Sequence, residues 1–248
     1  MRLPRLVQDV FDFCYPGVCA GCRGPCEPSE FLCGPCLGRL VQLESAAACQ
    51  RCGAPLVQTD APCPFCKGDG VPHYSRILRL GVFDDPLKDL IHQFKYQGRW
   101  AIGQQLARRL LEQPVIRELL PQVDVLVPVP LHFLRQLHRG YNQATVIARC
   151  LARYSGTPLK RPLARIRNTE TQTHLHSRAQ RFDNLRSAFR LIRPRSIRGK
   201  RVLVIDDVLT TGATLQTVGR ALRPARPSSL TALVLAVADP RGRGFRAV

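Results

Sequence analysis

The chain has 248 residues, of which 45% are hydrophobic, so it can bury a sizeable core as one ordinary domain or two small ones. No stretch reaches the ~18 uncharged apolar residues that a membrane span requires, and residues 1–19 lack the long apolar region of an export signal, so we expect a cytoplasmic protein without membrane insertion. The formal net charge of +19 excludes acidic disordered proteins and favours partners that carry phosphate.

Charge and cysteine content divide the chain into two parts. Residues 1–70 contain six Lys or Arg and seven Asp or Glu, a net charge of −1, together with ten of the eleven cysteines. Residues 71–248 contain 31 basic and 11 acidic residues, a net charge of +20. The glycines and the proline of residues 67–72 are typical of a linker. We therefore predict two domains, residues 1–70 and residues 71–248.

Eight of the N-terminal cysteines form four CxxC pairs with a repeating spacing. The pairs are Cys19/Cys22, Cys33/Cys36, Cys49/Cys52 and Cys63/Cys66. Ten residues separate the two pairs within each repeat, and twelve residues separate the repeats. Because four thiolates complete the tetrahedral shell that zinc prefers, we predict two structural zinc sites, with consecutive pairs sharing an ion as in a double zinc ribbon. A cross-braced pairing stays open, as do a disulfide framework and redox-active CxxC pairs.

Strand and helix patterns alternate in the second part of the chain. In chain order we expect helical segments over 84–113, a strand over 123–129, a helix over 140–154, a strand over 201–205, a helix over 214–222 and a strand over 230–237. The apolar run within 201–205 is typical of a strand that is buried on both faces of a parallel sheet. The alternation predicts an α/β fold in which helices flank a parallel sheet.

Residues 202–214 (VLVIDDVLTTGAT) carry the most specific motif. An apolar strand delivers two adjacent carboxylates, Asp206 and Asp207, to the carboxyl edge of the sheet, where α/β folds bind ligands. The small polar turn that follows offers backbone N–H groups, hydroxyls and a helix N-terminus to a phosphate. Its residues are Thr210, Thr211, Gly212, Ala213 and Thr214. Because carboxylates beside a phosphate site suit a ligand that also has sugar hydroxyls, we predict a phosphorylated ribose.

This motif resembles the phosphoribosyl pyrophosphate (PRPP) loop of type I phosphoribosyltransferases at every position. Together with the CxxC pairs, the whole chain resembles the ComF-type, competence-associated family, which joins a zinc module to a type I phosphoribosyltransferase domain. Further matching segments are residues 94–99 (FKYQGR), 127–131 (VPVPL), 139–143 (RGYNQ) and 167–175 (RNTETQTHL). The resemblance implies a type I phosphoribosyltransferase-like parallel sheet flanked by helices, with a small N-terminal double zinc-ribbon module.

The resemblance also implies roles for individual residues. Asp206 and Asp207 would act in catalysis by holding the ribose hydroxyls, and the turn at 210–214 would hold the 5′-phosphate. Mg²⁺ would accompany PRPP. The other implied site elements are Lys95 and Arg139 as substrate-binding cations, the latter beside a pyrophosphate-facing turn after residue 130, and residues 169–183 as a mobile loop that closes over the site.

The function that the resemblance implies is a Mg²⁺-dependent, PRPP-binding phosphoribosyltransferase of unknown acceptor, linked to DNA uptake in natural transformation. The alternative is a non-catalytic, PRPP-responsive protein that binds single-stranded DNA, with other DNA-uptake proteins as further partners. The intact acidic pair favours catalysis. Eleven Lys or Arg against two acidic residues between positions 165 and 201 favour nucleic acid, although such runs often form only a solvated face.

Overall fold

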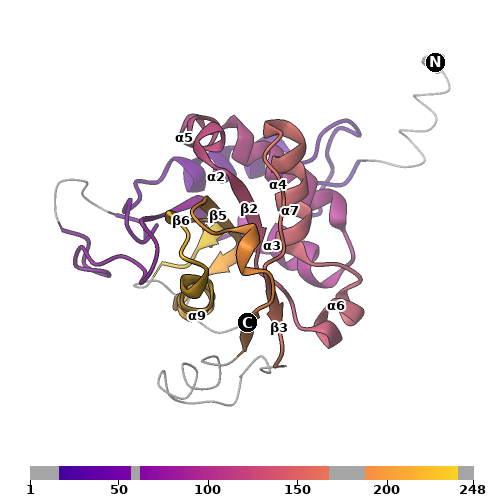
Figure 1. Cartoon of the computed structure of the whole chain (residues 1–248). Helices are drawn as coiled ribbons and strands as arrows, with labels where there is room; N and C mark the ends of the chain where they lie inside the picture. Colours follow the sequence, from indigo (N-terminus) through magenta and orange to yellow (C-terminus); the bar gives the residue numbers. More distant parts are fainter. Residues whose placement is uncertain (1–16, 57–61, 168–187, 240–248) are drawn as a thin grey trace.

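The computed structural model describes residues 17–56, 62–167 and 188–239. At its centre lies a four-stranded parallel sheet in the order β1-β6-β5-β2 (Figure 1). The strands are β1 (Arg76–Val82), β2 (Val125–Pro128), β5 (Arg201–Leu209) and β6 (Ser229–Val237), and a separate antiparallel pair is formed by β3 (Leu163–Arg165) and β4 (Phe189–Leu191). The predicted α/β fold with a parallel sheet is confirmed.

Helices cover both faces of the sheet. They are α2 (Gly34–Ser45), α3 (Leu87–Tyr96), α4 (Trp100–Glu112), α5 (Pro114–Leu119), α6 (Phe133–Arg139), α7 (Gln143–Ser155) and α9 (Ala213–Leu222), with short 3-10 helices η1 (Leu120–Gln122), η2 (Pro194–Ser196) and η3 (Arg223–Ala225). Residues of β5 alternate between two hydrophobic cores, because a strand has a side-chain period of two. Leu203 and Ile205 lie in the core that α3, α4 and α7 complete. Val202 and Val204 lie in the core that α9 completes.

Each half of the cysteine-rich part joins one of these two cores. Cys19 and Leu40 belong to the core with α3, whereas Cys52 belongs to the core with α9. The second cysteine repeat lies close to β6 at Gly53. There φ is +73°, and an added Cβ would lie 3.2 Å from a side-chain carbon of Val237. A glycine is therefore required at this left-handed position against the end of β6. The domain boundary near residue 70 stays a prediction, and the parts on either side of it share hydrophobic cores.

The sequence pattern does not predict β1. Two arginines, Arg76 and Arg79, interrupt its apolar residues, and a strand with charged residues in both halves does not look buried. Arg79 is buried nevertheless, because its guanidinium donates hydrogen bonds to the carbonyl oxygens of Gly53 (2.8 Å) and Ala46 (2.9 Å). A buried cation of this kind is tolerated when its donors are satisfied. The strand thus anchors the loops of the second cysteine repeat.

The helical segments expected over 84–113 are α3 and α4, which are separated near Gly98, whose φ of +67° ends the first helix. One boundary differs from the sequence prediction. β5 continues to Leu209, so the acidic pair lies within the strand rather than after it. Residues 169–183, which the resemblance assigns to a mobile loop, lie outside the described part of the chain. Across the described ranges, no helix is both long enough and apolar enough to cross a membrane.

Candidate functional site

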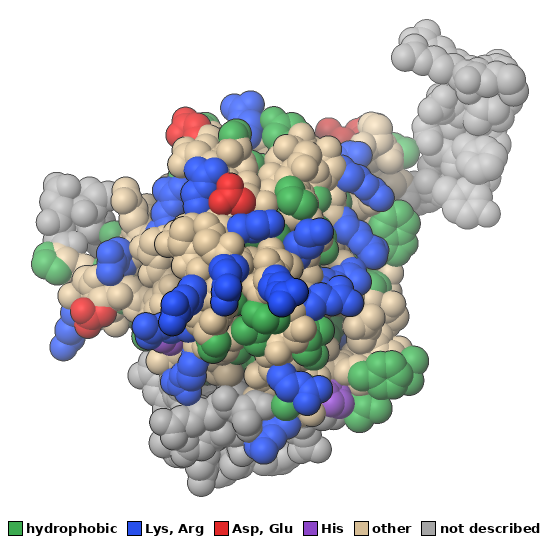
Figure 2. Space-filling model, viewed as in Figure 1, with side chains coloured by type: hydrophobic (Ala, Val, Ile, Leu, Met, Phe, Trp, Pro, Cys, Tyr) green, Lys and Arg blue, Asp and Glu red, His purple; other side chains and the backbone are tan. Residues whose placement is uncertain are grey.

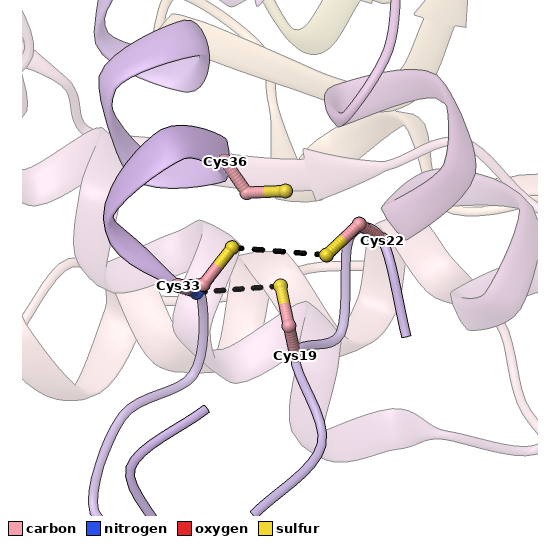
Figure 3. A group of neighbouring side chains, drawn as sticks. All are labelled: Cys19, Cys22, Cys33 and Cys36. Carbon is pink, nitrogen blue, oxygen red and sulfur yellow. Dashed lines mark hydrogen bonds between the residues drawn. The ribbon is translucent and has the colours of Figure 1, made fainter. Parts of the chain in front are cut away.

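The eight paired cysteines form two clusters of four sulfur atoms. Consecutive pairs share a cluster, and within each cluster all ligand atoms lie within 4.8 Å of one another. The members are Cys19, Cys22, Cys33 and Cys36 in the first cluster, drawn in Figure 3, and Cys49, Cys52, Cys63 and Cys66 in the second. The predicted sequential pairing is therefore confirmed, and the cross-braced arrangement is wrong.

The spacing of the sulfur atoms fits a tetrahedral metal site. The distances are 3.7 Å between the Sγ atoms of Cys22 and Cys33, 3.7 Å between those of Cys52 and Cys63, and 3.8 Å between those of Cys49 and Cys66. Sulfur atoms ~2.3 Å from a central zinc ion in a tetrahedron lie ~3.8 Å apart. A disulfide would require ~2.05 Å, and every described cysteine is free, which disfavours the disulfide alternative.

The backbone around Cys19 favours a thiolate. Its sulfur accepts hydrogen bonds from the backbone N–H groups of Gly21 and Cys33, both at 3.3 Å. Burial alone would raise the pKa of the Cys19 thiol, but the backbone N–H donors of Cys33, Cys22 and Gly21 outweigh it and lower the pKa to about 6. Because the thiolate is the form that ligates metal, the first CxxC turn is preorganised for an ion.

The acidic pair occupies the open edge of β5. Pairing between β2 and β5 ends with Pro128 opposite Ile205, and β5 continues for four more residues. Asp206 and Asp207 are the first of these, so they lie where β2 turns away from the sheet. The carboxyl end of a parallel sheet is where α/β folds usually bind their ligands.

A lysine from α3 completes this edge. The Nζ atom of Lys95 lies 2.9 Å from Oδ1 of Asp207, and the two side chains are only 19% and 16% exposed. The backbone N–H of Asp207 donates to Oδ1 of Asp206 at 2.9 Å. Burial and the charge of Asp207 together raise the pKa of Asp206 to about 7, against the smaller, opposite effects of the Asp207 N–H and of the charges of Lys95 and Arg165. A ligand that donates hydrogen bonds or brings a cation would therefore favour the ionised pair.

The turn after β5 leads directly into α9. Gly212 has φ +79° and stands at the N-terminus of the helix, and the backbone N–H of Ala213 lies 3.4 Å from Oγ1 of Thr211. Thr210 is exposed, Ala213 is buried, and Thr211, Gly212 and Thr214 are partly exposed. The structure thus places all five predicted turn residues immediately beyond the acidic pair, with no acidic residue in the first turn of α9.

Arg139 lies at the end of α6 and contacts α3. Its guanidinium is 4.7 Å from the ring centroid of Tyr96 and donates to the hydroxyl of Tyr96 (3.2 Å) and to Oε1 of Gln143 (3.3 Å). Since Lys95 and Tyr96 are adjacent, one turn of α3 contacts both Asp207 and Arg139. Both predicted cations therefore lie at the C-terminal end of α3.

The comparisons with known proteins agree with this arrangement. The sequence model of the phosphoribosyl transferase domain matches residues 105–246, more than half of the chain. The chain is 34% identical over 212 residues to the DNA utilization protein YhgH of Salmonella typhi (84% of this chain, 91% of that protein), and 33% identical over 210 residues to competence protein F of Haemophilus influenzae (83% and 90%). This chain belongs to the competence-associated phosphoribosyltransferase-domain family. Competence protein ComFC of Bacillus subtilis, 29% identical over 203 residues and 79% of each chain, is a further relative.

One charged residue of this phosphoribosyltransferase domain was not predicted as part of the site. Arg165 ends β3, and its guanidinium lies 5.4 Å from the ring centroid of Phe189. Burial and the charges of Arg135 and Arg139 together lower the pKa of Arg165 to about 10, and the charge of Asp206 opposes this shift. These effects place Arg165 within electrostatic reach of the acidic pair. The sequence did not indicate this role for Arg165, because β3 has only three residues and no periodic pattern of apolar residues.

Proposed function

We propose that this chain binds PRPP together with Mg²⁺ and transfers the phosphoribosyl group to an acceptor base. The observation that carries the proposal is the position of Asp206 and Asp207 on the open edge of β5, separated by two residues from the turn at 210–214, with Asp207 paired to Lys95. Acidic oxygens suit ribose hydroxyls, and a helix N-terminus suits a phosphate, so one phosphorylated sugar satisfies both halves of the site.

Each element of the site has a distinct task in this proposal. The carboxylates of Asp206 and Asp207 accept hydrogen bonds from the ribose hydroxyls and stabilise the positive charge that develops on the sugar as its bond to pyrophosphate breaks. The turn at 210–214 donates N–H and O–H groups to the 5′-phosphate. Arg139 and Lys95 provide positive charge near the leaving pyrophosphate. Mg²⁺, when bound, would stabilise the negative charge of that leaving group.

Incubation of the full-length protein with Mg²⁺, PRPP and a panel of purine and pyrimidine bases tests the proposal. Pyrophosphate release that depends on one base would identify the acceptor and the transferase activity. Binding of PRPP without release for any base would favour the non-catalytic alternative, a PRPP-responsive protein. Because the relatives are named for competence and DNA utilization, we propose DNA uptake, with its other proteins as partners, as the context of either activity.

The two cysteine clusters are proposed as structural Zn²⁺ sites. Four sulfurs fill the tetrahedral shell of each ion and leave no position for a substrate, which distinguishes structural from catalytic zinc. The tetrahedral sulfur spacing and the N–H···S contacts of Cys19 support this assignment.

Because the pKa of Asp206 is raised, ionisation of the acidic pair should lower the stability of the folded chain. An unfolded aspartate has a pKa of ~3.9, so between pH ~4 and ~7 the folded chain binds more protons here than the unfolded chain does, and stability falls as the pH rises. Asp206→Asn removes this ionisation. We expect the variant to melt at a higher temperature than wild type at pH 8, and the gain to shrink towards pH 4. A lower melting temperature at pH 8 would contradict the assigned direction of the shift.

A second candidate function is nucleic-acid binding, which the distribution of charge favours. Among residues 125–167 and 188–239 there are seventeen Lys or Arg, and the only acidic residues are Asp206, Asp207 and Asp239. Figure 2 shows Lys and Arg side chains gathered across the centre of one face, with few carboxylates among them. Affinity for a phosphate backbone rises with the number of such cations that can contact it.

Eight of these cations lie on neighbouring segments at the amino end of the sheet. We call them the basic edge: Lys160, Arg161, Arg193, Arg195, Arg198, Lys200, Arg223 and Arg226. Backbone hydrogen bonds join the segments, from Arg193 to Pro162 (3.2 Å) and from Gly199 to Arg226 (3.0 Å). The basic edge adjoins the start of β5, five residues before Asp206, which is ~16 Å away at ~3.3 Å per residue. Nucleic acid and PRPP would therefore bind at opposite ends of the sheet.

Charge reversal tests this surface in the full-length chain. We expect Arg193→Glu with Arg198→Glu and Arg226→Glu to weaken binding of a fluorescent single-stranded oligonucleotide roughly tenfold or more at low salt, because contacts that release counterions are lost. The matched control has the same change in net charge and reverses three exposed arginines of α4 and α7: Arg108, Arg149 and Arg153. Equal losses in both variants would show that overall charge, and not the basic edge, determines affinity.

A further inference from the structure

A buried glutamine connects the first cysteine cluster to α3. Gln93 is 1% exposed, and its Nε2 atom donates a 2.6 Å hydrogen bond to the carbonyl oxygen of Ala20, which lies between Cys19 and Cys22. Its Oε1 atom accepts a 2.6 Å hydrogen bond from Arg99. Both ends of the amide are therefore satisfied, which fixes its orientation. The peptide of the first CxxC turn is thus held directly by α3.

Apolar packing reinforces this connection. Leu90, Ile91 and Phe94 of α3 lie in the same buried core as Cys19 and Ala20. At the start of the helix, a Cβ added to Gly21 would lie 3.0 Å from the sulfur of Cys36 and 3.1 Å from Cβ of Pro86. The first cluster and α3 are therefore in van der Waals contact along the helix, with little room for one to move without the other.

The last turn of the same helix holds the site. Lys95, two residues after Gln93, pairs with Asp207, and Tyr96 contacts Arg139. The carbonyl oxygen of Phe94 accepts a hydrogen bond from the hydroxyl of Tyr141. A ten-residue helix is a stiff element ~15 Å long, so a shift of its cluster-facing side is transmitted to its last turn.

The second cluster has different neighbours. It lies in the core on the other side of the sheet, where Gly53 packs against Ile77 and Val237. Among the described hydrogen bonds, the one from Arg79 to Gly53 ties this repeat to β1. None of these contacts reaches Lys95 or Arg139, so the second cluster lacks the connection to α3 that the first cluster has.

We propose that the first cysteine cluster positions the PRPP site through Gln93 and α3, a route that the second cluster does not share. Gln93 is then a positioning residue, because it acts through Lys95 and Tyr96 and not on the substrate. When the first cluster holds its metal, the Ala20 carbonyl is fixed, α3 is held in place, and Lys95 stays against Asp207. The expected effect on ligand binding rests on the proposed PRPP site. The connection between the first cluster and α3 can be measured without PRPP.

Hydrogen–deuterium exchange tests the connection directly. Cys22→Ser and Cys66→Ser each remove the least buried sulfur of a cluster, an exposed one in the first cluster and a partly exposed one in the second. In the absence of PRPP, we expect Cys22→Ser to speed exchange over residues 87–97 and 139–143, while Cys66→Ser leaves these segments protected as in wild type. Unchanged protection in Cys22→Ser, or equal loss in both variants, would overturn the proposal.

A variant that leaves every sulfur in place tests the role of Gln93 itself. Gln93→Leu removes both hydrogen bonds, and Gln113→Leu is its matched control, because the Gln113 amide also donates to a backbone carbonyl, that of Leu80, at 2.9 Å but away from the end of α3. With both variants containing wild-type zinc, we expect Gln93→Leu to bind PRPP and Mg²⁺ about tenfold more weakly, and Gln113→Leu to match wild type even if its melting temperature falls. Wild-type affinity in Gln93→Leu would overturn the proposal. Absence of PRPP binding by the wild-type chain would instead contradict the proposed function, and the exchange experiment would still decide the connection.

Discussion

Replacing both aspartates of the open strand edge, Asp206→Asn with Asp207→Asn, should weaken PRPP binding severely and leave the fold intact. Asparagine keeps the shape of the side chain, but it removes the negative charge and replaces one acceptor oxygen with a donor. Hydrogen bonds to charged groups contribute ~1.5–3 kcal/mol each, so the loss of two carboxylates should weaken binding about 100-fold or more. Lys95 would also lose its partner at 2.9 Å and no longer be held beside the site.

The control for this prediction lies at the other end of the sheet, where Asp124 directly precedes β2. Asp124 pairs with Arg201 at the amino end of β5, with 2.8 Å between Oδ1 and the guanidinium, far from the open edge. Asp124→Asn therefore removes a carboxylate and an ion pair without touching the site. Calorimetry should show wild-type PRPP affinity for Asp124→Asn. Tight PRPP binding by the Asp206/Asp207 double variant would show that the site has been placed wrongly.

Loss of zinc from the second cluster should have the largest effect on stability. Structural zinc sites supply ~10–16 kcal/mol in small modules, which is comparable to the ~5–15 kcal/mol by which a whole domain is stable. Cys49 and Cys52 are buried beside Ile77 and Val237, so Cys49→Ser would leave unpaired thiols within the core. We expect this variant to contain one zinc per chain instead of two and to unfold its second cysteine repeat at or below ambient temperature, while the first repeat keeps its zinc.

Metal analysis and thermal melting of the purified protein check this prediction. Cys26→Ser is the control, because Cys26 lies in the cysteine-rich part but outside both four-sulfur clusters. It should retain two zinc ions and melt close to wild type. A wild-type protein that contains no zinc, or a Cys49→Ser protein that melts like wild type, would contradict the assignment of the clusters.

Features whose chemistry is local in sequence could be predicted. The spacing of the CxxC pairs predicts both clusters, because two sulfurs three residues apart reach one ion without any help from the rest of the fold. The motif at 202–214 predicts the strand, the acidic pair and the turn, because one continuous segment contains all three. The parallel sheet follows from the apolar run at 202–205, which is buried on both faces.

Contacts between distant segments could not be predicted from patterns. Gln93 and Ala20 are 73 residues apart, and nothing about a glutamine in an amphipathic helix shows that its amide will meet a CxxC turn. Arg165 approaches Asp206 only because β3 and β4 pair beside the sheet. β1 was missed for a related reason, since Arg79 looks solvent-exposed until the loop carbonyls that receive its hydrogen bonds are in place.

Calorimetric titration of the full-length, zinc-loaded protein with PRPP, in the presence and absence of Mg²⁺, tests the central claim most directly. The titration is best made at pH 8, where Asp206, with its pKa near 7, is mainly ionised. The proposal predicts one PRPP bound per chain, with binding that strengthens when Mg²⁺ is present and weakens as the pH falls below 7. No heat of binding at pH 8 with Mg²⁺, from protein that retains its zinc and its fold, would contradict it.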